Sequence, residues 1–226
     1  MASYLDRSIS LVGEEALKKM QEATILVIGL GGVGGTALEA LARSGFKHFL
    51  IVDNDKVDVT NLNRQIMYLN DDIGELKVDV CKKRLKAINP NIKVETFSLF
   101  INEETIEKFN DMKIDYIVDA IDKVMSKVAI LKFAAKRNIP VISSMGMGKR
   151  LDPSKVFVTT LNKTEGDPLA KKIRYECKQA GIDLKSIKVV CSKEEPIDSG
   201  EIIASMMSVP SSAGLNIVSE IIKYYK

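Results

Sequence analysis

The sequence predicts an α/β protein with a Rossmann-like, doubly wound and mostly parallel sheet. Three observations support this fold class. Apolar segments of strand length alternate with segments of helix length, a glycine-rich turn follows the first apolar segment, and polar residues stand where later apolar segments end. Strands that alternate with helices pair in parallel through right-handed crossovers, and ligands then bind beyond the carboxyl ends of the strands. We therefore expect the functional site at that edge of the sheet.

The length and composition predict one domain over residues 1–226. Apolar residues make up 46% of the 226 residues, which is enough for one continuous core. The core is expected over about residues 7–150, and a substrate-side extension of extra strands and helices over about residues 151–226. Strands are expected at 24–28, 49–52, 94–97, 116–119, 141–144, 156–161 and 187–191. Helices are expected at 14–22, 33–44, 74–88, 102–110, 124–137, 167–179 and 211–225, and a mobile loop at 192–205.

Charge and cysteine usage exclude several classes of protein. The net charge is only +3, so any contact with nucleic acid must be local rather than a matter of uniform basicity. Cys81, Cys177 and Cys191 are odd in number and far apart, which argues against a disulfide framework and a four-thiolate zinc site. We expect a reducing, cytoplasmic setting. No apolar run approaches the ~18 residues of a membrane span, so no integral membrane segment is expected.

The segment Gly29-Leu30-Gly31-Gly32-Val33-Gly34 is the first candidate for ligand binding. It lies between a strand and a helix, where glycines permit a tight turn and let backbone amides approach a phosphate. Asp53 follows the second strand, roughly 20 residues on, where a carboxylate accepts hydrogen bonds from ribose hydroxyls. These residues alone fit a dehydrogenase equally well, or a glycine turn that merely packs a helix on a strand.

Two cations favour a triphosphate ligand over a nicotinamide cofactor. Arg64, in the segment Asn61-Leu62-Asn63-Arg64-Gln65, offers a planar fork for phosphate oxygens, and Lys77 adds a point charge. Surface salt bridges are the alternative explanation for both. In the segment Asp119-Ala120-Ile121-Asp122, Asp119 is placed to hold Mg²⁺ against the phosphates. For Asp122 an N-cap on the next helix is the favoured interpretation.

In this order, the glycine turn, Asp53-Asn54-Asp55, residues 61–65, Gly74 with Lys77 and residues 119–122 resemble the ThiF/MoeB/HesA superfamily of ubiquitin-activating-type adenylating enzymes. The resemblance covers about residues 7–150. It implies ATP and Mg²⁺ as cofactors. It adds Asp55, Asn61, Asn63, Gln65, Ala120 and Asp122 to the nucleotide-binding residues, and makes Arg64, Lys77 and Asp119 catalytic. It further implies that Arg7, which otherwise would be an ordinary surface charge, reaches the ATP of a neighbouring subunit in a homodimer.

The rest of the chain resembles one branch of that superfamily, the tRNA threonylcarbamoyladenosine dehydratases. The supporting segments are 143–148, 152–153, 163–164, 167–170, Arg174, 189–192, 195–196 and 208–214. The resemblance implies an enzyme that adenylates the threonyl carboxylate of the modified tRNA and cyclises it with release of AMP and pyrophosphate. The chain departs from the pattern at Cys191, where an aromatic residue is expected. Whether a sulfur-transfer protein assists is left open.

The substrate determines what else the enzyme needs. Ring closure within one side chain has a high effective concentration, so no enzyme thioester is required. Cys81 is expected to pack in a helix, while reactivity of Cys177 and Cys191 stays open.

Basic residues near the expected mouth of the site are candidates for binding tRNA phosphates, and an ordinary solvated face is the alternative. They are Lys149, Arg150, Lys171, Lys172 and Arg174.

Three other functions fit part of this pattern. An activator of a ubiquitin-like sulfur-carrier protein uses the same adenylation, but typically carries paired CxxC motifs that this sequence lacks. An NAD(P)-binding oxidoreductase leaves Arg64, Lys77 and Asp119 unexplained. A non-catalytic nucleotide-binding scaffold would keep the glycines but has no need of Arg64 or Asp119.

Overall fold

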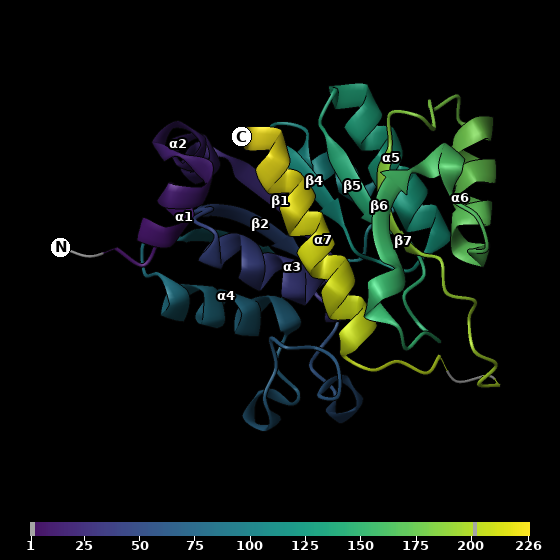
Figure 1. The fold of residues 1–226 in the computed structure, drawn as a ribbon, viewed down its shortest axis with the longest axis horizontal. Coiled ribbons are helices and arrows are strands. Elements are labelled where there is room, and N and C mark those ends of the chain that lie inside the picture. The colour runs from purple at the N-terminus through teal and green to yellow at the C-terminus, as the bar shows by residue number, and fades with distance from the viewer. Residues whose placement is uncertain (1–2, 201–202) are drawn as a thin grey trace.

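The computed structural model describes residues 3–200 and 203–226 and confirms the predicted α/β fold. A seven-stranded sheet has the order β3-β2-β1-β4-β5-β7-β6 (Figure 1). All neighbouring strands are parallel except β6 and β7. The strands are β1 (Thr24–Ile28), β2 (His48–Val52), β3 (Lys93–Phe97), β4 (Tyr116–Asp119), β5 (Val141–Ser144), β6 (Val156–Thr160) and β7 (Lys188–Ser192). Because β1 lies between β2 and β4, the strand order reverses beside the glycine turn, where such sheets bind ligands.

Helices connect these strands on both faces of the sheet. The α-helices are α1 (Asp6–Val12), α2 (Glu14–Glu22), α3 (Gly32–Arg43), α4 (Lys77–Ile88), α5 (Val124–Arg137), α6 (Pro168–Gln179) and α7 (Ser208–Tyr225). Short 3-10 helices are η1 (Val59–Asn61), η2 (Asn70–Asp72), η3 (Thr105–Phe109), η4 (Pro153–Lys155) and η5 (Leu161–Lys163). The predicted bounds of α2 and α5 are confirmed, whereas α1 was not anticipated.

Three predicted helices differ from the structure for local reasons. Gly74 has a left-handed φ of 91°, and Leu76 forms an isolated bridge with Lys56, so α4 begins at Lys77 rather than at Gly74. Asn102 does accept hydrogen bonds from the amides of Glu104 and Thr105, yet the segment that follows is the short 3-10 helix η3. Helix α7 begins at Ser208, three residues before the predicted start at Ser211.

The sheet is buried on both faces by two apolar clusters. Along β1, Ile25 and Val27 belong to the cluster under α3, α4 and α7, while Leu26 and Ile28 belong to the cluster under α5 and α6. Figure 1 shows α3, α4 and α7 in front of the sheet. Successive residues of a strand point to opposite faces, so a continuous apolar strand is what a sheet covered on both sides requires.

Helix α7 crosses α3 closely enough to reach the glycine turn. A Cβ on Gly214 would lie 2.6 Å from the carbonyl oxygen of Val33, so only a residue without a side chain fits this crossing. Near the start of α7, Pro210 packs against Gly32, because a Cβ built on Gly32 would lie 3.0 Å from Cβ of Pro210. The C-terminal extension therefore supports the nucleotide-side loop directly.

The predicted loop at 192–205 is tied to the segment that follows β5. Ser192 is the last residue of β7, and residues 201–202 lie outside the described residues. The amide of Ile197 donates to the Lys149 carbonyl, and the Lys149 amide donates to the Ala204 carbonyl, each at 2.7 Å. The described parts of the loop thus have defined partners.

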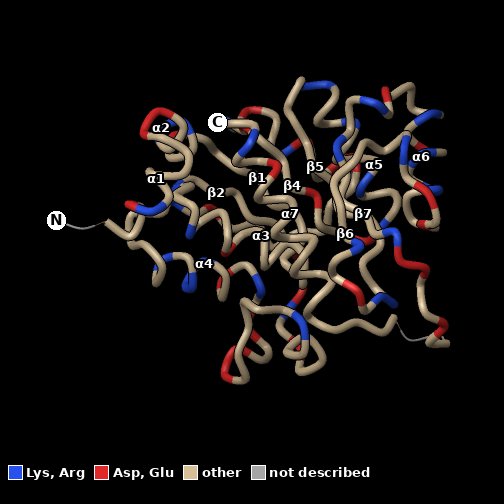
Figure 2. The backbone as a smooth tube through the Cα atoms, in the orientation of Figure 1, with Lys and Arg blue, Asp and Glu red and all other residues tan. Residues whose placement is uncertain are grey.

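The chain shows two further global features. None of the helices in residues 3–200 and 203–226 has both the length and the apolar character to cross a membrane. Basic and acidic residues are interspersed along the whole backbone rather than gathered on one face (Figure 2). Any recognition of a polyanion therefore depends on particular residues.

Candidate active site

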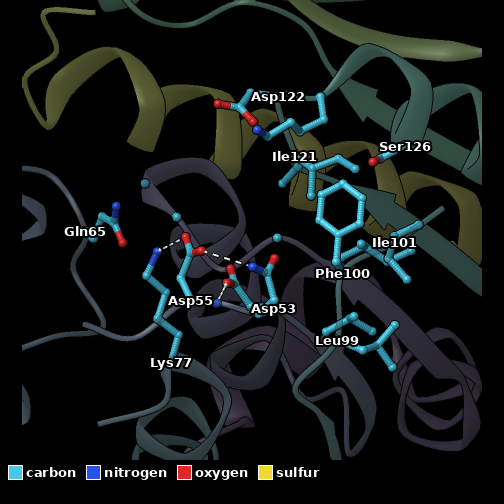
Figure 3. A pocket seen from close by; sticks show the side chains of 18 of the residues that line it. Asp53, Asp55, Gln65, Lys77, Leu99, Phe100, Ile101, Ile121, Asp122 and Ser126 are labelled. Carbon is cyan, nitrogen blue, oxygen red and sulfur yellow. Dashed lines mark hydrogen bonds and ion pairs between the residues drawn. The ribbon is translucent and has the colours of Figure 1, made fainter. Parts of the chain in front are cut away.

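A cavity of about 490 Å³ lies at the carboxyl ends of β1, β2 and β4 (Figure 3). Its lining combines the glycine turn with residues from the loops after β2, β3 and β4. The predicted nucleotide-site residues that line it are Gly29, Gly31, Gly32, Asp53, Asp55, Asn61, Arg64, Gln65, Lys77, Ala120 and Asp122. Val33, Gly34, Asn63, Asp119 and Arg7 are not among its lining residues.

The glycine turn brings backbone groups to the cavity. Gly29 has a φ of 89°, and a Cβ there would lie 2.8 Å from the carbonyl carbon of Ala120. A Cβ on Gly34 would lie 1.8 Å from the carbonyl oxygen of Gly29, so Gly34 serves the close packing of α3 on the turn rather than the lining. Helix α3 begins at Gly32, so the free amides of its first turn lie at the cavity edge, where they can bind an anion.

Asp53 is held in place by the backbone beside the glycine turn. Its Oδ2 accepts a hydrogen bond of 2.7 Å from the Leu30 amide, and its Oδ1 accepts one of 2.8 Å from the Asp55 amide. Burial raises the pKa of the Asp53 carboxyl above its ordinary value, although Lys77 and these two hydrogen bonds oppose the shift. The remaining lone pairs of a carboxylate can accept hydrogen bonds from a ligand.

Lys77 presents a buried charge to the cavity. Only 5% of the residue is exposed, and its Nζ is 2.9 Å from Oδ2 of Asp55 (Figure 3). The backbone amide of Lys77 also donates a hydrogen bond to the backbone carbonyl of Asp55. This double contact fixes the start of α4 beside the loop after β2. An ammonium group in such a place is available to a phosphate that displaces the carboxylate.

Arg64 is oriented by its own segment. Its Nη1 donates to the Thr60 carbonyl at 2.8 Å and to Oδ1 of Asn63 at 2.9 Å. Asn61 closes η1 by accepting a hydrogen bond from the Asp58 amide. Asn63 itself is exposed, and its Nδ2 donates at 2.8 Å to the carbonyl of Ser205. Asn63 therefore connects Arg64 with the loop before α7, instead of lining the cavity as predicted.

The structure corrects the predictions for the two acidic residues after β4. Asp119 is fully buried, and its Oδ2 lies 2.9 Å from Nζ of the equally buried Lys127 and 2.6 Å from Oγ of Ser143. A carboxylate so enclosed is not the open Mg²⁺ ligand that was predicted. Asp122, in contrast, is exposed and lines the cavity. It is not the N-cap either, because that position of α5 is Lys123.

Arg7 is distant from the cavity of its own chain. It is exposed on α1, two residues after Leu5. Leu5 packs beyond the C-terminal end of α3, since a Cβ on Gly45 would lie 3.4 Å from its methyl groups. The glycine turn is at the other end of this 12-residue helix, about 18 Å away. Figure 1 shows α1 at the end of the molecule that holds the N-terminus.

The predicted tRNA-binding residues fall into two groups. Lys171 and Lys172 are exposed on α6. Arg150 is only 3% exposed and donates through Nε to the Glu194 carbonyl, so its guanidinium is not free for a tRNA phosphate and that prediction is wrong. Arg174 is partly buried and donates to Thr164. Lys149 is half-buried, with Nζ bonded to the Gly200 carbonyl.

The three thiols are buried. Burial raises the pKa of Cys177 and of Cys191 to about 11, and that of Cys81 to about 12. At neutral pH such thiols are almost wholly protonated and are therefore poor nucleophiles. Cys81 packs in α4 as predicted, and the structure gives no support to a reactive Cys177 or Cys191.

Sequence reasoning missed one wall of the cavity. Leu99, Phe100 and Ile101 line it from the loop after β3, and Ile121, Lys123 and Ser126 complete the side next to α5. Phe100 is 46% exposed, which is unusual for a large apolar residue. The available signal was an apolar cluster directly after the third strand, at the edge where ligands bind.

Comparisons with known proteins agree with this geometry. The model of the ThiF family matches residues 5–225. The tRNA threonylcarbamoyladenosine dehydratase of Bacillus subtilis (strain 168) is 42% identical over 197 residues, covering 87% of this chain and 77% of that protein. The enzyme of the same name from Escherichia coli (strain K12) is 40% identical over 168 residues, covering 74% of this chain and 63% of that protein. A crystal structure of E. coli tRNA N6-threonylcarbamoyladenosine dehydratase with ATP has a TM-score of 0.93 at 34% identity, covering 98% of this chain and 93% of that chain.

Proposed function

We propose that this protein is an ATP-dependent dehydratase of threonylcarbamoyladenosine in tRNA. The chain belongs to the ThiF family and, within it, to the tRNA threonylcarbamoyladenosine dehydratases. The observation that carries the proposal is the cavity that joins the glycine turn, Asp53, Arg64 and Lys77. A nicotinamide-dependent enzyme has no need of two cations there, whereas a triphosphate does. The reaction takes place in the cytoplasm, where ATP and tRNA are available.

The residues of the cavity suggest how ATP binds. The phosphates lie at the start of α3, within reach of Arg64 and Lys77, and Asp53 accepts hydrogen bonds from the ribose hydroxyls. Gln65 has a buried Oε1 with no hydrogen-bond partner among the described residues, so a donor on the nucleotide would satisfy it. The apolar wall at Leu99 and Phe100 can cover the adenine.

Asp122 is the residue that fits Mg²⁺. Its carboxylate is exposed to the cavity, and Mg²⁺ is usually bound by one or two carboxylates together with substrate phosphates. When bound, the ion would neutralise charge on the phosphates. Asp119 supports the loop from below through Lys127 and Ser143 rather than reaching the phosphates.

The chemistry requires two steps. The threonyl carboxylate attacks the α-phosphorus of ATP, an acyl-adenylate forms, and pyrophosphate leaves. A carbamoyl heteroatom of the same side chain then attacks the activated carbonyl, closes the ring and expels AMP. The products are tRNA that carries the cyclic, dehydrated form of the nucleoside, AMP and pyrophosphate, with one carboxylate oxygen transferred to AMP. Arg64 and Lys77 stabilise the charge that develops as pyrophosphate leaves. The burial of all three thiols agrees with a route that forms no enzyme thioester.

A homodimer completes the proposed site. Arg7 is exposed and lies at the far end of α3 from the cavity of its own chain. It can therefore contact ATP only in a second copy. Lys171, Lys172 and Lys149 are the remaining candidates for tRNA phosphates, because Arg150 is enclosed and Arg174 is partly buried and bonded to Thr164. The two steps consume no sulfur, so a sulfur-transfer protein is an optional partner.

The test is a reaction of the purified protein with ATP, Mg²⁺ and tRNA that carries threonylcarbamoyladenosine. The tRNA is digested under mild conditions, the masses of its nucleosides are measured by mass spectrometry, and AMP formation is followed in parallel. The proposal expects the loss of one water for each AMP formed. No mass change in the tRNA, but AMP release on addition of a small carrier protein that ends in Gly-Gly, would assign the chain to the sulfur-carrier activators instead.

A further inference from the structure

A second cavity, of about 190 Å³, lies between the segment after β5 and the loop before α7. It is smaller than the sites that hold drug-sized ligands, so its size suits one heterocycle or one side chain. Leu151, Ile197 and Met206 line it, and each is between 45% and 61% exposed. Apolar side chains that stay exposed around a hollow are typical of a binding surface.

The walls of this cavity are fixed by the backbone. Lys149, whose amide and carbonyl bond to Ala204 and Ile197, has a φ of 61°, a left-handed conformation that a lysine rarely adopts. Across the cavity rim, the Glu194 carboxylate accepts hydrogen bonds from the amides of Leu151 and Asp152. Strained backbone that is held by its surroundings often occurs at functional sites.

The second cavity adjoins the nucleotide cavity. Asn63 donates to the carbonyl of Ser205, a lining residue of the second cavity, and accepts from Arg64, a lining residue of the nucleotide cavity. One asparagine side chain therefore spans the distance between the two walls. A ligand in the second cavity would therefore lie beside the nucleotide site.

The second cavity also carries positive charge. The Lys149 ammonium is bonded to a main-chain carbonyl rather than to a carboxylate. Arg150 also lines the cavity, but its guanidinium is enclosed and its Nη2 lies 3.8 Å from the Asp167 carboxylate, so Lys149 supplies the positive charge that a ligand can reach. A ligand that combines an apolar ring face with anionic groups is complementary to such a wall.

We propose that the second cavity receives the adenine ring of the threonylcarbamoyladenosine, turned out of the stacked bases of the tRNA. This inference rests on the proposed function and names the subsite that holds the nucleoside. Enzymes that act on a base take it out of the stack and hold it between apolar or aromatic side chains. With the ring between Leu151, Ile197 and Met206, the threonyl carboxylate extends past Asn63 toward the α-phosphate.

Met206→Trp tests the proposal by filling the cavity. We expect kcat/KM for modified tRNA to fall at least tenfold, about 1.4 kcal/mol, while the Kd for ATP stays within twofold. Met206→Leu conserves volume and should keep near-normal activity. Leu69→Trp is the matched control, because Leu69 is 63% exposed and Met206 61%. Circular dichroism and urea unfolding confirm that each variant is folded.

Competition by a tRNA that lacks the base at the modified position separates recognition of the adenine ring from general tRNA contact. The proposal predicts that Met206→Trp weakens inhibition by unmodified tRNA, which carries the same adenine ring, and leaves the inhibition constant of the abasic tRNA unchanged. An equal loss of affinity for the unmodified and the abasic tRNA would overturn it, as would full activity of Met206→Trp. If the wild-type protein itself does not convert modified tRNA, the proposed function fails, a result distinct from failure of the cavity variant alone.

Discussion

Single side chains in the nucleotide cavity are oriented before a ligand arrives. Arg64 is held by Thr60 and Asn63, and Lys77 by Asp55. Groups that are fixed in advance stabilise developing charge without reorganising during the reaction. At this scale the two residue types were predictable from the sequence. Their partners were not, because each partner depends on how a loop folds back.

Replacing either cation by alanine should abolish adenylation. We expect Lys77→Ala or Arg64→Ala to lower AMP formation by about 10²-fold or more, which is typical for loss of one charge-stabilising group. The fold should persist, because neither side chain belongs to the apolar clusters. Lys83→Ala is the control, since Lys83 lies on the same helix and pairs with Glu75. Normal AMP formation in either cavity variant would sink the assignment of these residues.

Because the pKa of Asp53 is raised, we expect the affinity of the nucleotide site for ATP to depend on pH on the acid side. Burial favours the neutral acid, so a proton is taken up at a higher pH than by an ordinary aspartate. ATP affinity should fall as the pH drops through this raised pKa and recover above it, because only the ionised group offers all its lone pairs to the ribose. Calorimetry from about pH 4, near the ordinary pKa of an aspartate, up to about pH 8 measures this, with corrections for the titration of ATP. In Asp53→Asn the affinity should be weaker at neutral pH and this acid limb should vanish; an unchanged acid limb would exclude Asp53 as its source.

At the scale of elements, the turn between β4 and α5 depends on a buried ion pair. The turn presses on Gly29, and the pair of Asp119 and Lys127 lies beneath it, with both residues at 0% exposure. Removing one member of a buried pair leaves an uncompensated charge, whereas replacing both leaves none. This ion pair is why the prediction of Asp119 as a Mg²⁺ ligand was wrong. The sequence does not indicate that Lys127, in the first turn of α5, points inward to pair with it.

A double-mutant cycle tests the ion pair. Lys127→Met alone should lower the free energy of unfolding by about 3–5 kcal/mol, and the double variant Asp119→Asn with Lys127→Met should recover most of that loss. Urea unfolding measures both. In the double variant the Mg²⁺ dependence of ATP binding should persist, because Asp122 and not Asp119 faces the cavity. Loss of Mg²⁺ dependence there would return the metal role to Asp119.

The strands show which local features the sequence determines well. The strands β1, β4 and β5 were located to within a residue, because each contains a short apolar run of the kind that a sheet covered on both faces requires. Helix starts were less predictable. Gly74 adopts a left-handed conformation and delays α4, and the packing of Pro210 on Gly32 accompanies the earlier start of α7. The delay at Gly74 is local, since glycine readily adopts this conformation, whereas the packing of Pro210 on Gly32 is a tertiary contact that no local pattern encodes.

For the whole molecule, the wall formed by Leu99 and Phe100 and the position of Arg7 were the hardest features to anticipate. The wall belongs to a loop with no motif of its own. Arg7 is separated from its chain's cavity by the length of α3, so any role in ATP binding is a property of the assembly. Such a role exists only when two copies of the chain assemble, so the pattern of residues within one chain does not reveal it.

Mixing two inactive variants tests the dimer. Arg7→Ala and Lys77→Ala subunits, each inactive alone, should together recover about a quarter of wild-type activity after exchange, because half of the dimers are mixed and each has one intact site. The double variant Arg7→Ala with Lys77→Ala, mixed with Arg7→Ala, is the control that should recover none. Absence of recovery despite proven subunit exchange would contradict the shared site.

The most direct measurement of the central claim follows the oxygen of the threonyl carboxylate. tRNA carrying threonylcarbamoyladenosine with ¹⁸O in that carboxylate is converted with unlabelled ATP, and the products are weighed. Attack of the carboxylate on the α-phosphorus, followed by ring closure, places one ¹⁸O in AMP and none in pyrophosphate. ¹⁸O in inorganic phosphate with ADP as the nucleotide product, or AMP without label, would contradict adenylation of the threonyl carboxylate by this chain.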